Sequence, residues 1–135
     1  MSWKESLVRI SSYEVEMLQR RLAEVAARRA DAELRLVILA AEAEAEIARA
    51  DQDAQAGWYR AGFLQAMRNR RAAVQAEIAA LAAEEAGARD ALAEAFEALK
   101  RFEHIAETAR LAAVKEEARR ETVALDELGL RKRAR

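Results

Sequence analysis

The chain has 135 residues, of which 35% are charged, and it contains no proline, no cysteine and only 4 glycines. This composition excludes disulfides, thiolate metal sites and a sheet-rich domain, and 23 basic against 24 acidic residues leave no strong field to attract nucleic acid. Alanine at 35 positions, together with Glu, Arg and Leu, is typical of long helices. We therefore predict an all-α protein forming one domain over residues 1–135.

The first predicted element is a helix over about residues 3–52. Its apolar residues recur at alternating steps of three and four, which is the repeat of a coiled-coil seam. No secretory signal precedes it, and the longest apolar runs, of six residues, are far shorter than the roughly 20 that span a bilayer. The seam comprises Val15, Leu18, Leu22, Val25, Arg29, Ala32, Leu36, Leu39, Ala43, Glu46 and Ala50.

A turn over about residues 53–61 and a second helix over about 62–130 come next, followed by a basic tail at 131–135. Gly57, Gly62 and the helix-capping Asp51 and Asp53 indicate the turn. The matched repeats predict an antiparallel two-helix coiled-coil hairpin. The second seam comprises Leu64, Met67, Arg71, Val74, Ile78, Leu81, Glu85, Ala88, Leu92, Ala95, Leu99, Phe102, Ala106 and Ala109.

Two registers of this hairpin satisfy the repeat. In the favoured one Glu46 faces Arg71, and Arg29 lies one layer from Glu85, so that every charged seam residue meets an opposite charge. In the other, shifted by one heptad, Arg71 lies against Leu39, which is tolerable where long side chains reach water. On the outer faces, acidic residues four positions before arginine, as in Glu24–Arg28 and Asp31–Arg35, predict ion pairs within each helix.

The second helix is longer than the first, so residues from about 115 onward are predicted to overhang. The joined ends carry more apolar side chains than one seam requires, which indicates either a partner surface or ends that fray or pair in crystals. The turn region is also rich in aromatic residues. It indicates either a docking hot spot or local packing of the turn. The turn set is Trp58, Tyr59, Phe63, Leu64 and Met67.

No pattern in the chain indicates catalysis. The single His104 has neither a cysteine nor a second histidine within helical reach, and the carboxylates at residues 42–53 are spread around their helix rather than converging on a cation. Gly57 and Gly62 lack the lysine and hydroxyl of a phosphate-binding loop. We expect no enzymatic activity, no cofactor and no metal.

Three segments, in chain order, resemble the flagellar FliJ family. They are residues 6–24 (from Ser6-Leu7-Val8-Arg9-Ile10 to Arg21-Leu22-Ala23-Glu24), the segment from Trp58-Tyr59 to Phe63-Leu64-Gln65-Ala66-Met67, and Leu125-Asp126-Glu127-Leu128 with the basic residues after it. The resemblance implies a cytoplasmic protein of the flagellar type III export apparatus, peripherally associated with the inner face of the membrane at the flagellar base.

The resemblance also implies partners. The joined helix ends would contact the hexameric export ATPase, the region near the turn would contact the cytoplasmic domain of the export gate, and export chaperones would bind as well. A general export chaperone and a self-associating structural coiled coil are alternative functions, and weak self-association is compatible with each. The gate-docking candidates are Trp58, Tyr59, Phe63, Leu64 and Met67, with Arg70 and Val74 next, and the ATPase-binding candidates are Leu7, Ile10, Leu125, Leu128 and Arg131.

Overall fold

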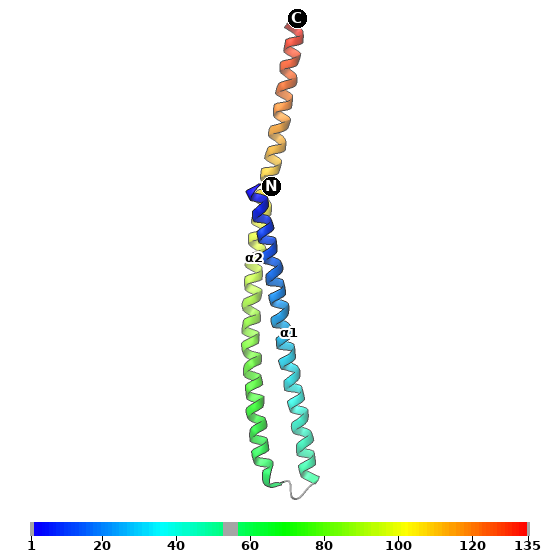
Figure 1. The fold of residues 1–135 in the computed structure, drawn as a ribbon, viewed down its shortest axis with the longest axis vertical. Helices are drawn as coiled ribbons and strands as arrows, with labels where there is room; N and C mark the ends of the chain where they lie inside the picture. The colour runs from blue at the N-terminus through cyan, green and yellow to red at the C-terminus, as the bar shows by residue number, and fades with distance from the viewer. Residues whose placement is uncertain (1, 53–56, 135) are drawn as a thin grey trace. The chain divides into compact units, whose positions relative to one another are not determined.

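Two long helices make up the protein. The computed structural model describes residues 2–52 and 57–134, in which α1 spans Trp3–Gln52 and α2 spans Gly57–Ala134 (Figure 1). The described residues contain no strand. The two helices pack against each other in opposite directions, so the predicted all-α helical hairpin is confirmed.

A reciprocal cap begins α1. The backbone amide of Glu5 donates to the Ser2 hydroxyl at 3.2 Å, and the Ser2 amide donates to the Glu5 carboxylate at 3.3 Å. This capping box satisfies two amides that have no acceptor within the first turn of a helix. The serine and glutamate at this spacing therefore determine where α1 begins.

The start of α2 differs from the predicted turn. Gly57–Ala61 are helical, whereas the turn was expected to extend to residue 61; Asp53 and the rest of 53–56 lie outside the described residues. Contacts with α1 explain the early start. The Tyr59 hydroxyl donates to Glu46 at 3.2 Å, and Arg60 forms an ion pair with Asp51 at 2.7 Å. These contacts outweigh the weak helix propensity of Gly57.

The end of α2 also lies beyond its predicted position. The helix continues through Ala134 and therefore includes residues 131–134 of the basic tail. Arg135 is not among the residues that the structure describes. No proline interrupts this segment, and the basic side chains of the last turn complement the negative end of the helix dipole.

The contacts divide the chain into two units. Residues 17–92 form the hairpin unit, and residues 1–16 with 93–135 form the terminal unit. In the hairpin unit, the cyan part of α1 lies beside the green part of α2 (Figure 1). Its buried apolar residues all belong to the predicted seams: Val25, Ala32, Ala50, Met67, Val74 and Leu81.

The hairpin unit adopts the second of the two registers. A hollow of about 180 Å³ is lined by Leu39 and Ala43 from α1 and by Met67 and Arg71 from α2, so Arg71 lies level with Leu39. The favoured register, with Glu46 facing Arg71, is wrong. Arg71 is exposed and reaches water from the thin seam, so it does not require an acidic partner.

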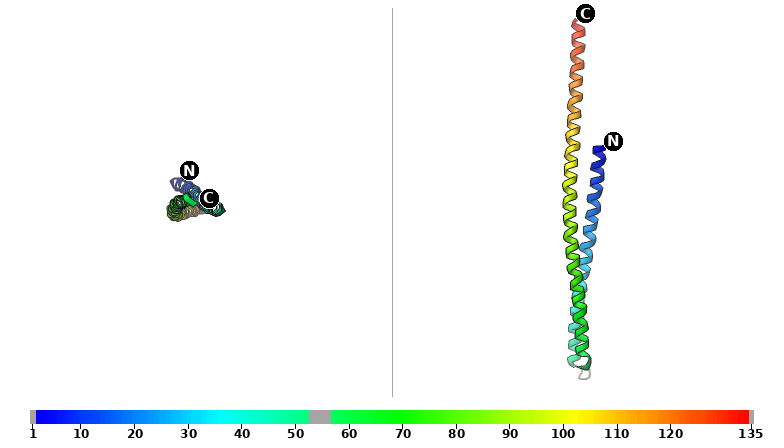
Figure 2. Two further views of the ribbon diagram at one scale, coloured as in Figure 1. Left: turned by 90° about the horizontal axis from the view of Figure 1, so that it is seen from below. Right: turned by 90° about the vertical axis from the view of Figure 1, so that its left-hand side faces the viewer.

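In the terminal unit the start of α1 packs against the middle of α2. Ser11 and Val15 are buried on α1, and Ala95 and Leu99 are buried on α2. Beyond this contact, residues 111–134 are exposed except for the half-buried Glu116. In Figures 1 and 2 the orange and red part of α2 continues past the start of α1 within this unit, which confirms the predicted overhang.

The seam supplies the apolar burial of the hairpin unit, so truncating a buried seam leucine should be costly. Leu81 is 4% exposed, and we expect Leu81→Ala to lower the free energy of unfolding by about 2–4 kcal/mol. Urea denaturation followed by circular dichroism measures this change. The matched control is Leu34→Ala on the outer face of α1, where the side chain is 58% exposed and we expect a change within about 0.5 kcal/mol. Equal losses of unfolding free energy in Leu81→Ala and Leu34→Ala would contradict the assignment of Leu81 to the buried seam.

Candidate functional site

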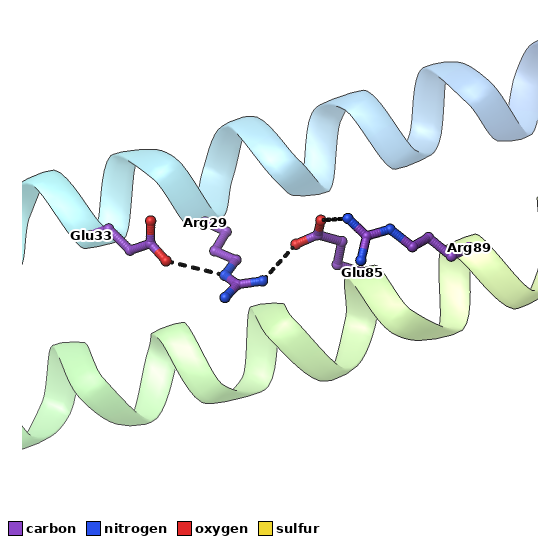
Figure 3. A network of polar contacts seen from close by, with 4 residues as sticks. All are labelled: Arg29, Glu33, Glu85 and Arg89. Atoms are coloured by element: carbon purple, nitrogen blue, oxygen red, sulfur yellow. Dashed lines mark hydrogen bonds and ion pairs between the residues drawn. The ribbon is translucent and has the colours of Figure 1, made fainter.

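A charged network crosses the seam of the hairpin unit (Figure 3). The Glu85 residue is 6% exposed, and its carboxylate accepts hydrogen bonds from Arg29 of α1 at 3.1 Å and from Arg89 of α2 at 2.7 Å. Arg29 also donates to Glu33 at 3.2 Å. The predicted proximity of Arg29 and Glu85 is therefore a direct contact, whereas Glu46 instead accepts from Arg49 and Tyr59.

The network is suited to positioning the helices rather than to chemistry. The hydrogen bond to Glu85 raises the pKa of Arg29, so this guanidinium stays charged across the physiological pH range. Each oxygen of the buried carboxylate accepts a hydrogen bond from a guanidinium group. The residues that the structure describes contain no group of three or more side chains that could hold a metal ion.

Removing one charge should therefore cost more than removing both. We expect Arg29→Leu to lower the free energy of unfolding by about 1–2 kcal/mol, because Glu85 stays buried with Arg89 alone. The double variant Arg29→Leu with Glu85→Leu should recover most of this loss, since two leucines suit a coiled-coil seam. Urea denaturation of the single and double variants measures both effects. A double variant less stable than either single variant would contradict this expectation, because the two losses would then add instead of compensating for each other.

Ion pairs along the edges of the seam also join the two helices. Arg35 of α1 donates to Glu77 of α2 at 2.7 Å, and Glu84 of α2 accepts from Arg21 and lies 3.6 Å from Arg28. The hydrogen bond from Arg35 lowers the pKa of Glu77 below its ordinary value. Arg28 and Arg35 were expected to pair within α1 but reach across to α2 instead.

The lowered pKa of Glu77 gives acid sensitivity of a definite sign. Because the carboxylate is favoured in the folded state, its contribution to stability is present above the ordinary glutamate pKa of about 4.3 and is lost as the pH falls through the lower folded value. We expect Glu77→Gln to reduce the drop in urea midpoint between about pH 6 and pH 3. The control Glu44→Gln, nine residues beyond Arg35 on α1, should leave that drop nearly unchanged. An identical drop in the wild type and Glu77→Gln would contradict the assignment.

The aromatic residues near the start of α2 have different environments. Trp58 is 85% exposed and contacts the Tyr59 ring edge to face, with centroids 5.5 Å apart. The Tyr59 hydroxyl is tied to α1 because it accepts from Arg49 at 3.1 Å and donates to Glu46. Trp58 therefore suits contact with a partner, whereas Tyr59 packs the end of the hairpin unit. Of the two interpretations of this segment, a docking hot spot fits Trp58 and local packing fits Tyr59.

The remaining gate-docking candidates do not form one face. Phe63 and Arg70 line a hollow with Glu42 and Arg49, whereas Leu64 lines the hollow that contains Leu39 and Arg71; Met67 lies between the two and lines both. Met67 is only 7% exposed and Val74 only 9%, so both belong to the seam rather than to a docking surface. Sequence reasoning missed Glu42 and Arg49 because they approach Phe63 only in the observed register. The second of the two predicted registers, with Arg71 against Leu39, would have placed Glu42 and Arg49 near Phe63.

The ATPase-binding candidates lie in two separate places. Leu7 is half-buried and Ile10 is 63% exposed near the start of α1, where Val8 shares a hollow with α2 residues that end at Arg110. Leu125, Leu128 and Arg131 are exposed on the overhang. At 1.5 Å per residue, Leu125 is roughly 22 Å farther along α2 than Arg110. The structure therefore does not bring the two halves of this set together.

The fold and these surfaces define the class of the protein: an antiparallel two-helix coiled coil whose exposed apolar side chains suit contacts with other proteins. Neither described helix is long and apolar enough to cross a membrane. His104 is exposed. In the charged network, each oxygen of the Glu85 carboxylate accepts a hydrogen bond from an arginine.

Comparison with known proteins identifies the family. The chain is 50% identical over 132 residues to two relatives named Flagellar FliJ protein, from Caulobacter vibrioides strains NA1000 / CB15N and ATCC 19089 / CIP 103742 / CB 15. Each match covers 98% of this chain and 95% of the relative. The chain belongs to the FliJ family of flagellar proteins, and the predicted resemblance is confirmed. No protein-family model and no solved structure matches the chain.

Proposed function

We propose that this protein is a non-enzymatic component of the bacterial flagellar type III export apparatus. In this function it is a stalk and adaptor that couples the hexameric export ATPase to the export gate and helps to deliver chaperone-bound substrates. The observation that carries the proposal is the 50% identity to Flagellar FliJ protein across 98% of the chain. We place the protein in the cytoplasm, peripherally associated with the membrane at the flagellar base.

The exposed overhang supports an ATPase contact. It presents Leu125, which is 68% exposed, Leu128, which is 54% exposed, and Leu130, which is 66% exposed, beside the basic Arg131 and Arg133. Apolar side chains left uncovered on a soluble helix are favourable sites for burial against a partner. Their place on a free stretch of α2 leaves them open on all sides within the terminal unit.

Trp58 supports a gate contact near the start of α2. Tryptophan is enriched at the energetic centres of protein interfaces, and this one is 85% exposed although it stands beside Tyr59. Phe63 is half-buried and lines a hollow with the exposed Arg70, which provides a second contact of mixed character. Met67 lines the same hollow as Phe63, and Met67 and Val74 are both buried in the seam.

Two other functions share these surfaces. A general export chaperone would use the same exposed leucines to hold export substrates, and a self-associating structural coiled coil would use them to hold a second copy. Both predict different binding partners for the overhang. Binding measurements with the ATPase, the gate domain and the protein alone therefore distinguish the three functions.

Reciprocal substitutions test the stalk function. We expect Leu128→Asp to weaken binding to the export ATPase at least about tenfold while leaving gate binding intact, and Trp58→Ala to do the reverse. Binding to purified ATPase and gate domain, with motility in soft agar, measures the outcome. The control is Leu34→Asp, which alters a leucine of similar exposure (58% against 54%) in the hairpin unit and should preserve both interactions. Retained binding to both partners in both variants would refute the proposal.

A further inference from the structure

One layer of the hairpin unit is poorly matched. Arg71 is a seam residue of α2 that faces Leu39, and both line the hollow of about 180 Å³. Among residues 2–52 and 57–134, Arg71 forms no ion pair. The seam glutamate of the opposite helix, Glu46, lies seven residues along α1 from Leu39 and is held by Arg49 and Tyr59. Two complementary seam charges are thus offset by one heptad.

A slide of one heptad would remove this mismatch. Because both seams follow the same 3.5-residue repeat, moving α1 by seven residues along α2 places every seam position opposite another seam position. Glu46 would then face Arg71, Leu39 would face Ile78, and Leu36 would face Leu81. The displacement is about 10 Å at 1.5 Å per residue.

The charged network tolerates either register. In the observed register the heptad repeat places Arg29 level with Leu81. Glu85 is four residues farther along α2 than Leu81, and Arg29 reaches it with a hydrogen bond. After the slide Arg29 is level with Ala88, and Glu85 is three residues away on the other side. At the edge of the seam, Arg35 would exchange Glu77 for Glu84, which lies seven residues later. Arg29 and Arg35 therefore find a carboxylate in both registers, whereas Arg21 and Arg28, which pair with Glu84 in the observed register, would come level with Ala91.

The first turns of α2 are suited to lengthen the connection during the slide. Gly57 and Gly62 lie in this helix although glycine is a poor helix former. Neither has a positive φ, and a Cβ added to either would meet nothing within 4 Å. Close packing therefore does not require these glycines, and they make unwinding of Gly57–Gly62 easier.

Tyr59 opposes this unwinding. Its hydroxyl joins the first turn of α2 to both Glu46 and Arg49 of α1, and the adjacent Arg60 pairs with Asp51. The hydrogen bond from Tyr59 also engages the Glu46 carboxylate, which would pair with Arg71 after the slide.

We propose that the hairpin unit has a second register, one heptad from the observed one, in which Glu46 pairs with Arg71 and Gly57–Gly62 leave the helix. Tyr59 holds the observed register by keeping the first turn of α2 and the Glu46 carboxylate in place. The protein therefore contains a two-position slide between its helices, and this device does not depend on which partners it binds.

Cysteine cross-linking in the full chain tests the slide, because the natural sequence has no cysteine. Leu36→Cys with Val74→Cys reports the observed register, and Leu36→Cys with Leu81→Cys reports the second. The control pair is Leu36→Cys with Ile78→Cys, whose positions are level in neither register. In the observed register Leu36 faces Val74, and Ile78 is closer to Val74 than Leu81 is. Oxidation at low protein concentration, with bonds within one chain counted on denaturing gels, gives the three rates.

We expect the first pair to form fastest and the second to form more slowly, but faster than the control. Tyr59→Phe should raise the rate of the second pair about tenfold, since a hydrogen bond to a charged group is lost. Adding Arg71→Gln should cancel this increase, and Gly57→Ala with Gly62→Ala should lower the rate several-fold. Circular dichroism checks that each variant remains helical.

The result that overturns the proposal is a second pair that forms no faster than the control, because random sliding would favour the nearer control position. A rate that Tyr59→Phe leaves unchanged would also overturn it, since the hydroxyl would then not hold the register.

Discussion

A two-helix coiled coil buries one narrow stripe of side chains, and no second layer compensates for a mismatch. In the hairpin unit this stripe leaves Val25 fully buried and Leu81 4% exposed, whereas Leu34 on the outer face is 58% exposed. Each layer brings together side chains from only two helices, so the register decides which pairs share the limited apolar burial. The rest of the structure depends on that register.

The two charged positions within the seam show different ways of meeting this constraint. Glu85 is buried, and a buried carboxylate is costly unless its oxygens are hydrogen-bonded, which Arg29 and Arg89 accomplish. Arg71 has a long side chain that reaches water from the edge of the seam, so it needs no acidic partner. The cost at Arg71 is the hollow beside Leu39 rather than an unsatisfied charge.

Such a molecule acts through its surface. The charged network joins the two helices through Glu85, whose two oxygens accept from Arg29 and Arg89. Exposed apolar side chains occur on the overhang, as at Leu125, and where α2 begins, as at Trp58, but also on the outer faces of the paired helices, as at Leu34 and Val37. This distribution agrees with membership of a flagellar protein family and with the proposed function as an adaptor between larger partners.

The sequence alone determined the all-α hairpin, the seam positions and the overhang, because a 3.5-residue repeat repeated on two segments allows few other folds. It also placed Arg29 near Glu85, but on the basis of the register that the structure does not adopt. Only the tertiary structure decided the register, since both alternatives place seam against seam and the choice depends on contacts such as Tyr59 with Glu46 and Arg60 with Asp51. It likewise decided that Gly57–Ala61 are helical, because the contacts of Tyr59 and Arg60 depend on what α1 presents at that level.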